Sequence, residues 1–584
     1  MDVIAVVGAR LNSNRLPRKH LLDLSGKPLI ARIFDRLDRV PELRECILAT
    51  TADSYNRPLV DWAEAQGRRA FAYEGDVNDL VGRIDYIVSR ERPKMVLYIC
   101  GDSPLIEPTT ISRMIRALAR GADRVAFPTR DGVPVVHEGI DLFPFIVWNR
   151  LVLEAEQPFE REHVGQSLVH FAKDLNHVPL EDDPVFYRPK LRLSVDTPSD
   201  YQFMSELYRR WYAVHDADSI VDLAWVLDEV DRDPALRGIN AQVRQKTAQE
   251  SSTSVQIVTA TGPGTGMGHL SRAISVASGL QDAASAGVKL LIQGPSFEKA
   301  ELDLLPHVFV EFEEMFETIE RDLAQRSVQV VILDLPARYL GEEWLRFIEG
   351  LRGKGIKVVS LDFTVTDSER VDLQWVPSFF LRESDMESAN LVFGWECFLL
   401  GSRRMTRTWK PGSELLVLTG GSDVHGFGDV LPGQLDEDLP AHFKVHWVRG
   451  PFAREPKLPS EPRLEWTVHE NPKDLSSLIT RCHFGFALYG VSLFECLHHG
   501  LPTVTLAPGR SDEDRELKAL QQADLAVVGH SLAEAVDGLR HLIFDPHHAR
   551  AISDASQQRL DGQGPTRLAR RILDLLQEES VSKN

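Results

Sequence analysis

Four basic residues stand close together just after the first apolar run of the sequence: Arg10, Arg15, Arg18 and Lys19. Arginine offers a planar fork to phosphate oxygens and lysine a compact charge, so this mixture suits a nucleoside triphosphate. The loop follows a predicted strand, and ligands of parallel sheets bind beyond the carboxyl ends of the strands. The alternative interpretation is a solvated basic loop that binds nothing.

Two aspartates farther along the chain favour the phosphate interpretation. Asp102 and Asp196 each follow an apolar, strand-like run and precede a turn that contains proline. Carboxylates at neighbouring strand ends are suited to hold Mg²⁺ against phosphates, because this ion prefers octahedral oxygen ligands. Taken singly, each residue is an ordinary turn or capping aspartate. Together with the basic loop, they predict a magnesium-dependent site for nucleotidyl transfer.

A second candidate site begins at the glycine-rich turn "TGPGTGMGHLSRA", residues 261–273. Gly266 and Gly268 allow a ligand to approach the backbone, and the helix expected to start here favours a phosphate at its N-terminus. His269 is the titratable residue of this turn that is suited to act as a general base near neutral pH. The alternative is a histidine that only caps the helix.

A later part of the chain adds "LTGGSD" (418–423) and "LYGVSLFECLHHGLPTV" (488–504). A strand-to-helix turn of this kind binds a diphosphate through backbone N–H groups, while Glu495 is suited to accept hydrogen bonds from ribose hydroxyls. A carboxylate in the first turn of a helix is also favoured by the helix dipole without any ligand.

Short β-branched strands alternating with amphipathic helices position these residues. In the first part of the chain we expect strands at 3–7, 46–51 and 95–100 and a helix at 28–37. This alternation predicts βα units and a mostly parallel sheet covered on both faces. The polar stretch 240–254 lacks apolar periodicity, which predicts an interdomain linker.

The same pattern restarts twice after the linker, as expected for a chain of 584 residues that is too long for one core. One series of strands begins at 255–260 and a second at 414–418. They predict two Rossmann-like lobes that meet near residues 401–412. The predicted α/β domains are 1–239, 255–404 and 405–584, with the linker at 240–254.

The overall composition restricts the class of protein. The net charge of −20 argues against a nucleic-acid or anionic-membrane partner. No stretch approaches 18 apolar residues, and the opening residues are unlike a signal peptide. The five cysteines are scattered without a Cys-x-x-Cys pair, which suggests neither a zinc site nor a disulfide framework. We therefore expect a cytoplasmic enzyme.

Five stretches occur in the order of a known family: "ARLNSNRLPRKHLLDLSGKPLI", "ILATTADSYNRPLVDWAE", "GDSPLIEP", "EREHVG" and "LRLSVDTPSDYQFM". Residues 1–230 thereby resemble the cytidylyltransferases that make CMP-activated acidic sugars, most closely the spore-coat polysaccharide type. The resemblance implies that a sugar hydroxyl attacks the α-phosphate of CTP and that pyrophosphate leaves. It also suggests a homodimer formed through this domain.

The resemblance also implies roles for individual residues. Arg10 and Lys19 would hold the triphosphate as catalytic residues, and Asp102 and Asp196 would hold Mg²⁺. The expected nucleotide-binding residues of this domain are Gly8, Ala9, Arg15, Ala49 and Thr50, of which the last two would help to recognise cytidine.

Three positions carry further questions. Arg15 has the alternative role of bracing the loop. Where the family has "RLPGK", this sequence has "RLPRK", so Arg18 replaces a glycine and adds a charge. His163 matches the family's "REHV", where a structural or dimer-contact role competes with catalysis.

A second set of stretches spans residues 255–510: "GMGHLSR", "VVILDL", "VVSLDF", "LVFGWECFLL", "TGGSD" and "GVSLFECLHHGLPTV". They resemble the GT-B-fold nucleotide-sugar hydrolases of pseudaminic-acid biosynthesis. The resemblance implies a GT-B-like pair of lobes in which His269 activates water for attack at the anomeric carbon of a UDP-aminosugar. The expected nucleotide-binding residues here are Gly266, Gly268, Gly420, Gly421, Ser422, Gly490, Ser492 and Glu495. Tyr489 departs from the family, which has a second glycine there.

Together these observations predict a bifunctional enzyme of nonulosonic-acid biosynthesis, which activates an acidic sugar with CTP and hydrolyses a UDP-aminosugar. One alternative is a cytidylyltransferase fused to a GT-B glycosyltransferase. Another is a fusion to a module that binds a nucleotide sugar without turning it over. The sequence leaves open which sugar each half uses.

Overall fold

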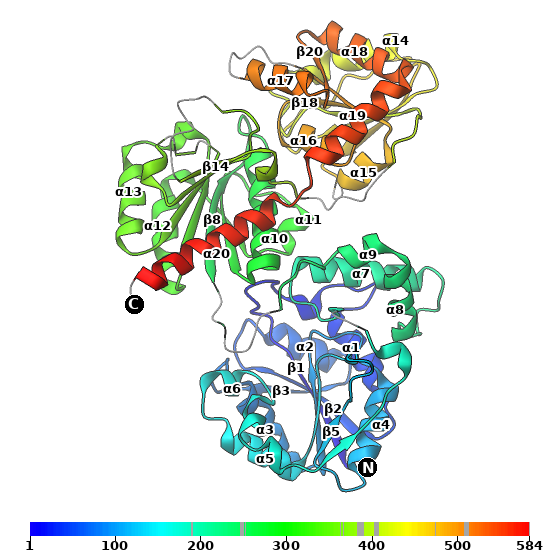
Figure 1. The fold of residues 1–584 in the computed structure, drawn as a ribbon, viewed down its shortest axis with the longest axis vertical. Coiled ribbons are helices and arrows are strands. Elements are labelled where there is room, and N and C mark those ends of the chain that lie inside the picture. Colours follow the sequence, from blue (N-terminus) through cyan, green and yellow to red (C-terminus); the bar gives the residue numbers. More distant parts are fainter. Residues whose placement is uncertain are drawn as a thin grey trace. The chain divides into compact units, whose positions relative to one another are not determined.

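The computed structural model describes residues 1–188, 191–245, 250, 253–362, 364–365, 367–381, 390–401, 408–472, 475–506 and 513–582. The chain forms two compact units, Met1–Ser251 and Ser252–Asn584 (Figure 1). Their junction falls inside the predicted linker, most of whose second half lies outside the described residues. The predicted lobe boundary between residues 404 and 405 also lies outside them.

The first unit is built on a five-stranded sheet in the order β3-β2-β1-β4-β6. Strands β1 to β4 are parallel, and β6 runs antiparallel to β4. Parallel strands present their carboxyl ends at one edge of the sheet. The basic loop follows β1 at this edge, and Asp102 lies in the turn after β4. The strands are β1 (Val3–Gly8), β2 (Leu43–Thr51), β3 (Arg69–Tyr73), β4 (Met95–Cys100) and β6 (Ile140–Pro144).

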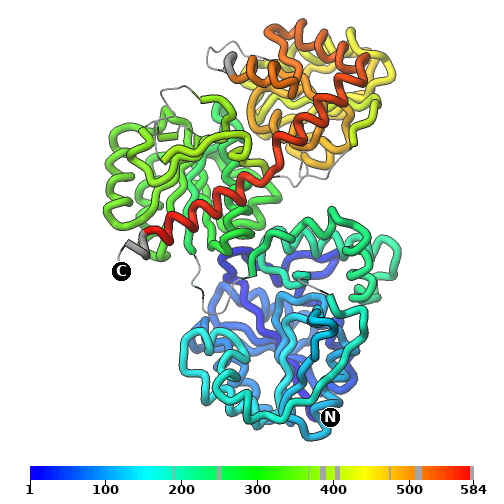
Figure 2. The backbone as a smooth tube through the Cα atoms, viewed as in Figure 1, coloured from blue at the N-terminus to red at the C-terminus, as the bar shows by residue number. Residues whose placement is uncertain are grey.

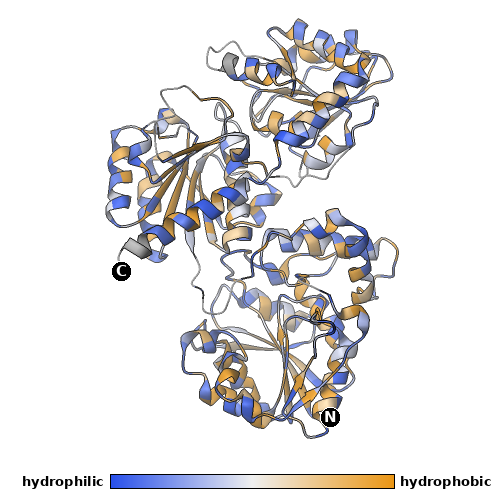
Figure 3. Ribbon diagram, viewed as in Figure 1, coloured by the Kyte–Doolittle hydropathy of each residue, from blue (hydrophilic) through white to orange (hydrophobic). Residues whose placement is uncertain are grey.

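Helices cover both faces of this sheet, so the central strand β1 is buried from Val3 to Val7. Such a strand is a continuous apolar run rather than an alternating one. Figure 3 shows the hydrophobic strands inside and hydrophilic helix faces outside. The helices are α1 (Leu29–Leu37), α2 (Arg57–Ala65), α3 (Leu80–Glu91), α4 (Pro108–Leu118), α5 (Phe145–Glu154), α6 (Pro158–Glu162), α7 (Pro198–Tyr212), α8 (Leu223–Arg232) and α9 (Pro234–Gly238).

The second unit holds two parallel sheets, ordered β10-β9-β8-β11-β12-β13-β14 and β17-β16-β15-β18-β19-β20. In both sheets the first strand of the series lies in the middle, and later strands are added first on one side of it and then on the other. This is the doubly wound strand order of Rossmann folds. The predicted α/β fold with two successive lobes is therefore confirmed.

The first lobe contains β8 (Ser254–Ala260), β9 (Gly287–Gln293), β10 (His307–Val310), β11 (Val330–Asp334), β12 (Lys357–Leu361), β13 (Leu373–Val376) and β14 (Leu391–Phe393). Its helices are α10 (Gly268–Ala284), α11 (Ala300–Asp303), α12 (Met315–Gln325) and α13 (Glu342–Gly353).

The second lobe contains β15 (Glu414–Leu418), β16 (Lys444–Arg449), β17 (Glu465–Glu470), β18 (Phe484–Leu488), β19 (Thr503–Leu506) and β20 (Val527–Gly529). Its helices are α14 (Leu431–Asp438), α15 (Leu475–Arg481), α16 (Val491–His498), α17 (Glu513–Gln522), α18 (Leu532–Phe544) and α19 (Pro546–Arg559).

The last helix, α20 (Gly564–Ser582), differs from the sequence-based division of the lobes. It packs against α10, and Leu568, Ala569 and Ile572 join the core of the first lobe. Gly279 permits this contact, because a Cβ atom there would lie 2.6 Å from Pro565 Cβ. Figures 1 and 2 show this red helix running across the green lobe. Its apolar periodicity predicts a buried face but does not specify which lobe covers it.

Two further expectations concern the whole chain. All five cysteines are free. Within the described residues, no helix combines the length and the apolar character needed to cross a bilayer.

Candidate active sites

The ammonium group of Lys19 joins the two aspartates that the sequence singles out. Lys19 lies on the short helix η1 (Lys19–Leu21), and its Nζ donates to Asp102 Oδ2 and Asp196 Oδ1, each at 2.8 Å. Burial alone would lower the pKa of Lys19, but the two carboxylates outweigh burial and raise it. Lys19 is therefore a fixed positive charge at the carboxyl edge of the sheet.

Backbone hydrogen bonds bring the two aspartates to the same edge. Asp102 lies in the turn after β4, and its carbonyl oxygen accepts from the Val195 N–H at 2.9 Å. The next residue, Asp196, precedes α7, where Asp200 Oδ2 accepts from the N–H groups of Asp196 and Thr197 at 3.1 Å. This capping box holds the second aspartate at the start of a helix.

The two carboxylates differ in how far cations neutralise them. Asp196 also contacts Arg15 at 3.2 Å and Arg192 at 2.6 Å. Burial would raise the pKa of Asp196, yet Lys19, Arg15 and Arg192 hold it well below its usual range. Asp102 pairs with Lys19, and its Oδ1 receives a long hydrogen bond of 3.4 Å from Ser103. Asp102 is thus the carboxylate with more capacity for a ligand.

Arg10 lies at a different point of this edge, beside an arginine that the sequence analysis missed. Arg10 Nη1 donates to the carbonyl oxygen of Val77 at 3.2 Å and to Asn78 Oδ1 at 2.9 Å. Arg83 Nη2 donates to the same Val77 oxygen at 2.6 Å. Burial, followed by the charge of Arg10, lowers the pKa of Arg83 to about 10.

Arg83 is 3% exposed, and its Nε has no hydrogen-bond partner among the described residues. The two guanidinium groups converge on one carbonyl oxygen, and Arg10 Nη2 also lies 3.5 Å from Glu162 Oε1. Guanidinium groups are suited to bind phosphate oxygens. No motif marks Arg83 in the sequence, and it lies on α3, a helix that the sequence analysis did not single out.

The remaining predicted residues of this half serve the strand ends. A Cβ atom at Gly8 would lie 3.0 Å from the Tyr98 ring, so close packing excludes a side chain there. The Ala9 N–H donates to the Ala49 oxygen at 3.0 Å, and the Ala49 side chain lies in the hydrophobic core. The buried Thr50 hydroxyl has no hydrogen-bond partner within the described residues.

A second missed residue, Asn56, holds the basic loop itself. It is fully buried, and its Oδ1 accepts from the Leu11 N–H at 2.6 Å. His163 follows α6, where its N–H donates to the Phe159 oxygen at 3.1 Å. The Asn56 contact fixes the backbone of the basic loop, and the His163 contact closes the last turn of α6.

Arg18 keeps the backbone conformation that a glycine would favour. Its φ of 54° and ψ of 22° lie in the left-handed region, which disfavours residues that carry a Cβ atom. Its side chain is exposed. Arg18 therefore holds a backbone conformation that carries a cost for a residue with a Cβ atom.

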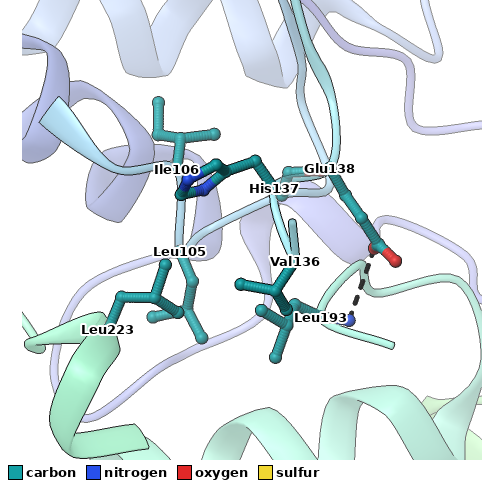
Figure 4. A pocket seen from close by; sticks show the side chains of 8 residues that line it. Leu105, Ile106, Val136, His137, Glu138, Leu193 and Leu223 are labelled. Carbon is teal, nitrogen blue, oxygen red and sulfur yellow. Dashed lines mark hydrogen bonds between the residues drawn. The ribbon is translucent and has the colours of Figure 1, made fainter. Parts of the chain in front are cut away.

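A small cavity of about 10 Å³, shown in Figure 4, is lined in part by Ser103, the residue after Asp102. Glu138 closes one wall, where its carboxylate accepts from the Leu193 N–H at 3.4 Å and the Ser194 N–H at 3.1 Å. The cavity has room for about one water molecule and is too small for a sugar. Its lining residues are Ser103, Leu105, Ile106, Val136, His137, Glu138, Leu193 and Leu223.

In the second unit, His269 stands at the start of α10 and contacts a residue that the sequence analysis did not select. His269 Nδ1 lies 2.7 Å from Asp334 Oδ1, at the carboxyl end of β11. Asp334 is fully buried, and Arg272 also donates to it. Burial would raise the pKa of Asp334, but Arg272 and His269 hold it below its usual range. The signal in the sequence was an acid ending the apolar run "VVILD".

The glycine-rich turns of the two lobes come together beside His269. A Cβ atom at Gly421 would lie 2.7 Å from Met267 Cγ and 2.9 Å from Met267 N. Ser422 Oγ lies 3.5 Å from the Gly262 oxygen. A Cβ atom at Gly268 would lie 3.8 Å from Val491 at the start of α16. Gly266 and Gly420 have φ values of 75° and 86°, which explains glycine at both positions.

The turn before α16 carries the other predicted nucleotide-binding residues. Gly490 has a φ of 150° and immediately precedes the helix on which Ser492 and Glu495 lie. Burial raises the pKa of Glu495 to about 7, partly opposed by Lys299. The departure at Tyr489 has a structural partner, because its hydroxyl donates to Glu516.

Comparisons with known proteins divide the chain in the same way. Residues 4–139 match the family model described as cytidylyltransferase. This stretch carries the basic loop, Lys19, Arg83 and Asp102. The first unit is therefore called the cytidylyltransferase-like unit below.

Three relatives align with the cytidylyltransferase-like unit. An uncharacterized protein of Methanocaldococcus jannaschii is 24% identical over 43% of this chain and 99% of its own length. The spore coat polysaccharide biosynthesis protein SpsF of Bacillus subtilis is 22% identical over 36% of this chain and 87% of its own. The 3-deoxy-manno-octulosonate cytidylyltransferase of Geobacter sulfurreducens is 30% identical over 20% of this chain, which spans 46% of that relative.

Two solved structures align with different parts of the chain. A cytidylyltransferase from Leptospira borgpetersenii covers 40% of this chain and 96% of its own, with 19% identity and a TM-score of 0.36. MurG of Acinetobacter baumannii covers 55% of this chain and 99% of its own, with 14% identity and a TM-score of 0.39.

The donor set around Lys19 is compatible with a metal bound together with phosphates. Mg²⁺ usually takes one or two carboxylates from the protein and its other oxygen ligands from water and phosphate. Asp102 and Asp196 supply such carboxylates. Within the described ranges, no group of three or more His, Cys, Asp and Glu side chains is placed to hold a metal ion by itself.

Proposed function

We propose that the cytidylyltransferase-like unit transfers CMP from CTP to a hydroxyl of an acidic sugar and releases pyrophosphate. The observation that carries this proposal is the contact of Lys19 with Asp102 and Asp196 at the carboxyl edge of a parallel sheet. The family match over residues 4–139 supports the same reaction class.

The reaction forms a bond between the sugar oxygen and the α-phosphorus and breaks the bond to the bridging oxygen of pyrophosphate. Arg10, Arg83 and Lys19 would bind the phosphates and stabilise the charge that develops on the leaving group. Asp102, with Asp196 beside it, would hold Mg²⁺, which supplies further charge neutralisation when it is bound.

Pyrophosphate release from CTP tests this proposal with a panel of nonulosonic acids, Kdo, neutral sugars and sugar phosphates. We expect turnover only with acidic sugars in the presence of Mg²⁺, and its loss in Asp102→Asn. Turnover with another acceptor class instead would reassign the sugar, and absence of turnover with every acceptor would refute the proposal.

We also propose that the second unit transfers a sugar from a nucleoside diphosphate to a hydroxyl group, with His269 as the general base. The observation that carries this proposal is the 2.7 Å contact between His269 Nδ1 and Asp334 beside the two glycine-rich turns. Nε2 would take the proton of the hydroxyl while its oxygen attacks the anomeric carbon and the nucleoside diphosphate leaves. Gly420, Gly421, Ser422, Ser492 and Glu495 would hold the nucleotide.

Glycosyl transfer and hydrolysis differ only in the hydroxyl that attacks. The hydrolysis of a UDP-aminosugar is the second candidate, because the motif "GMGHLSR" stands at His269 and the same base would activate water. UDP release from a panel of UDP-sugars, with and without added sugar and lipid-linked acceptors, distinguishes the two. Release that requires an acceptor supports transfer, whereas release of free sugar supports hydrolysis.

In either case, His269→Ala should abolish UDP release and leave pyrophosphate release from CTP unchanged. Unchanged UDP release in this variant would refute the assignment of His269 as the base. Tight UDP binding without turnover of any donor would instead support a module that only binds a nucleotide sugar.

A further inference from the structure

The guanidinium group of Arg272 contacts both oxygens of the Asp334 carboxylate, which also contacts His269. Arg272 lies on α10, one helical turn after the histidine, and is 9% exposed. Its Nε donates to Asp334 Oδ2 at 3.0 Å and its Nη2 to Asp334 Oδ1 at 2.5 Å. The remaining nitrogen, Nη1, donates to Asp362 Oδ2 at 3.0 Å. The guanidinium thus makes a two-point contact with one acid and is tethered by a second.

Arg272 therefore donates hydrogen bonds to both oxygens of Asp334, and Oδ1 also accepts one from His269 Nδ1. A charged pair with two parallel hydrogen bonds restricts the orientation of the carboxylate plane. This restriction passes to the imidazole ring, because Nδ1 carries the hydrogen that Oδ1 accepts. Nε2 is then the nitrogen with a lone pair.

The charge of Arg272 matters as much as its geometry. A buried carboxylate beside a histidine favours the protonated imidazole, which no longer accepts a proton. Arg272 neutralises Asp334 and itself lies 3.2 Å from His269 Nδ1. Arg272 and Asp334 therefore act on the ring with opposite charges.

We propose that Arg272 is a positioning residue, which holds the Asp334 carboxylate against His269 Nδ1 and so leaves Nε2 as the nitrogen that accepts a proton. The proposal rests on the proposed function of the second unit only for the hydroxyl from which that proton comes.

Other charged groups around His269 have partners of their own. On the first lobe, Arg338 of η6 (Ala337–Tyr339) donates to Thr265 Oγ1 at 3.0 Å. Hydrogen bonds with Thr265 and Arg338 lower the pKa of the neighbouring Tyr339 phenol. Asp362, after β12, is held by Arg272.

The second lobe contributes two acids. Glu495 lies on α16, which packs against α10. Burial raises the pKa of Glu495, while the charge of Lys299 lowers it and that of Glu301 raises it further. In the loop after β15, Asp423 accepts from the N–H groups of Phe427 and Gly428 at 3.0 and 2.8 Å. Arg272 is therefore the group whose charge we expect to dominate at Asp334.

The experiment follows the titration of the His269 ring by NMR in the full-length, unliganded protein labelled at histidine. The signal is assigned by its loss in His269→Asn. The variants are Arg272→Met, Asp334→Asn and the double variant, which lacks both charges. Arg338→Met is the matched control, because Arg338 lies beside the same turn without contacting Asp334. Circular dichroism establishes that each variant is folded.

In Arg272→Met, the titration midpoint of His269 should move up by about one pH unit, because Asp334 then acts on the ring unscreened. In Asp334→Asn it should move down, because the charge of Arg272 remains. The double variant leaves no unpaired buried charge and should return toward the wild-type midpoint. Arg338→Met should leave the midpoint unchanged.

An unchanged midpoint in Arg272→Met would overturn the proposal. If that variant does not fold, a midpoint that rises or stays constant in Asp334→Asn would overturn it equally. A merely structural Arg272 would lower kcat at every pH, whereas a positioning residue also shifts the acid limb of the profile for UDP release. If the midpoints shift as expected but no donor sugar is turned over, the proposed function fails and the inference about Arg272 stands.

Discussion

Asp196 Oδ1 lies 2.8 Å from Lys19 Nζ, and two arginines share the same carboxylate. Among the described residues, Lys19 is the only cation that forms a salt bridge with Asp102. The two aspartates that the sequence analysis treats as equivalent therefore differ in their surroundings, and the consequences of replacing them should differ too.

We expect Asp196→Asn to lower the free energy of unfolding of the first unit by roughly 2–4 kcal/mol, because three cations lose the charge of their shared partner. Asp102→Asn should lower it by less, because Lys19 keeps Asp196 as its partner, while abolishing CTP turnover. Chemical denaturation and pyrophosphate release measure the two effects. Equal losses of stability would contradict the proposed division.

Arg18 offers a test of the left-handed backbone in the basic loop. Arg18→Gly should make the first unit more stable than Arg18→Ala by about 1 kcal/mol, because only the alanine variant keeps a Cβ atom at a φ of 54°. Both variants remove the same exposed charge, so each is the control for the other. Equal melting temperatures would show that the loop relaxes away from this conformation.

His20 predicts a pH dependence for the stability of the first unit. Burial, together with the neighbouring Lys19, lowers the pKa of His20 to about 4, while its Nδ1 lies 2.7 Å from the Gly101 oxygen. The unfolded chain binds a proton near pH 6.5, so stability is present above that pH and is lost as the pH falls toward 4. The expected loss is on the order of 2 kcal/mol at pH 5.

Denaturation at pH 7 and pH 5 measures this loss. The matched variant is His20→Asn, whose amide keeps a donor toward Gly101 but does not titrate. It should remove the contribution of His20 between pH 7 and pH 5, an interval in which Asp141, whose pKa burial raises to about 6, titrates in both proteins. A wild-type slope in this variant would mean that other groups are responsible.

Arg83 should contribute to binding at the expense of stability. Its buried charge faces Arg10, so Arg83→Met should leave the melting temperature unchanged or higher without nucleotide. The same variant should weaken CTP binding about tenfold or more, because a charge-assisted contact to phosphate is lost. Arg83→Lys keeps the charge and should bind CTP more tightly than Arg83→Met.

Melting curves with and without CTP test both parts of this prediction. A large destabilisation of the free protein would indicate a structural role for Arg83. An unchanged shift of the melting temperature by CTP would exclude contact with the nucleotide.

Many elements of the fold, and the edge of each sheet at which the candidate sites lie, can be predicted from the sequence. Apolar runs such as residues 3–7 and 255–260 predict buried parallel strands, since only these are covered on both faces. Parallel strands place the residues that follow them at the carboxyl edge of their sheet, which is where we expected Lys19 and Asp102 in the first unit and His269 in the second. This inference needs only the direction of each strand.

Which side chains contact one another depends on packing that the sequence patterns do not specify. His269 pairs with Asp334, Arg10 contacts the Val77 oxygen beside Arg83, and Lys19 and Arg15 contact Asp196. Each of these contacts joins elements far apart in the sequence. The packing of α20 on the first lobe has the same origin. Periodicity specifies which face of an element is buried, but the partner of that face depends on how the elements pack in three dimensions.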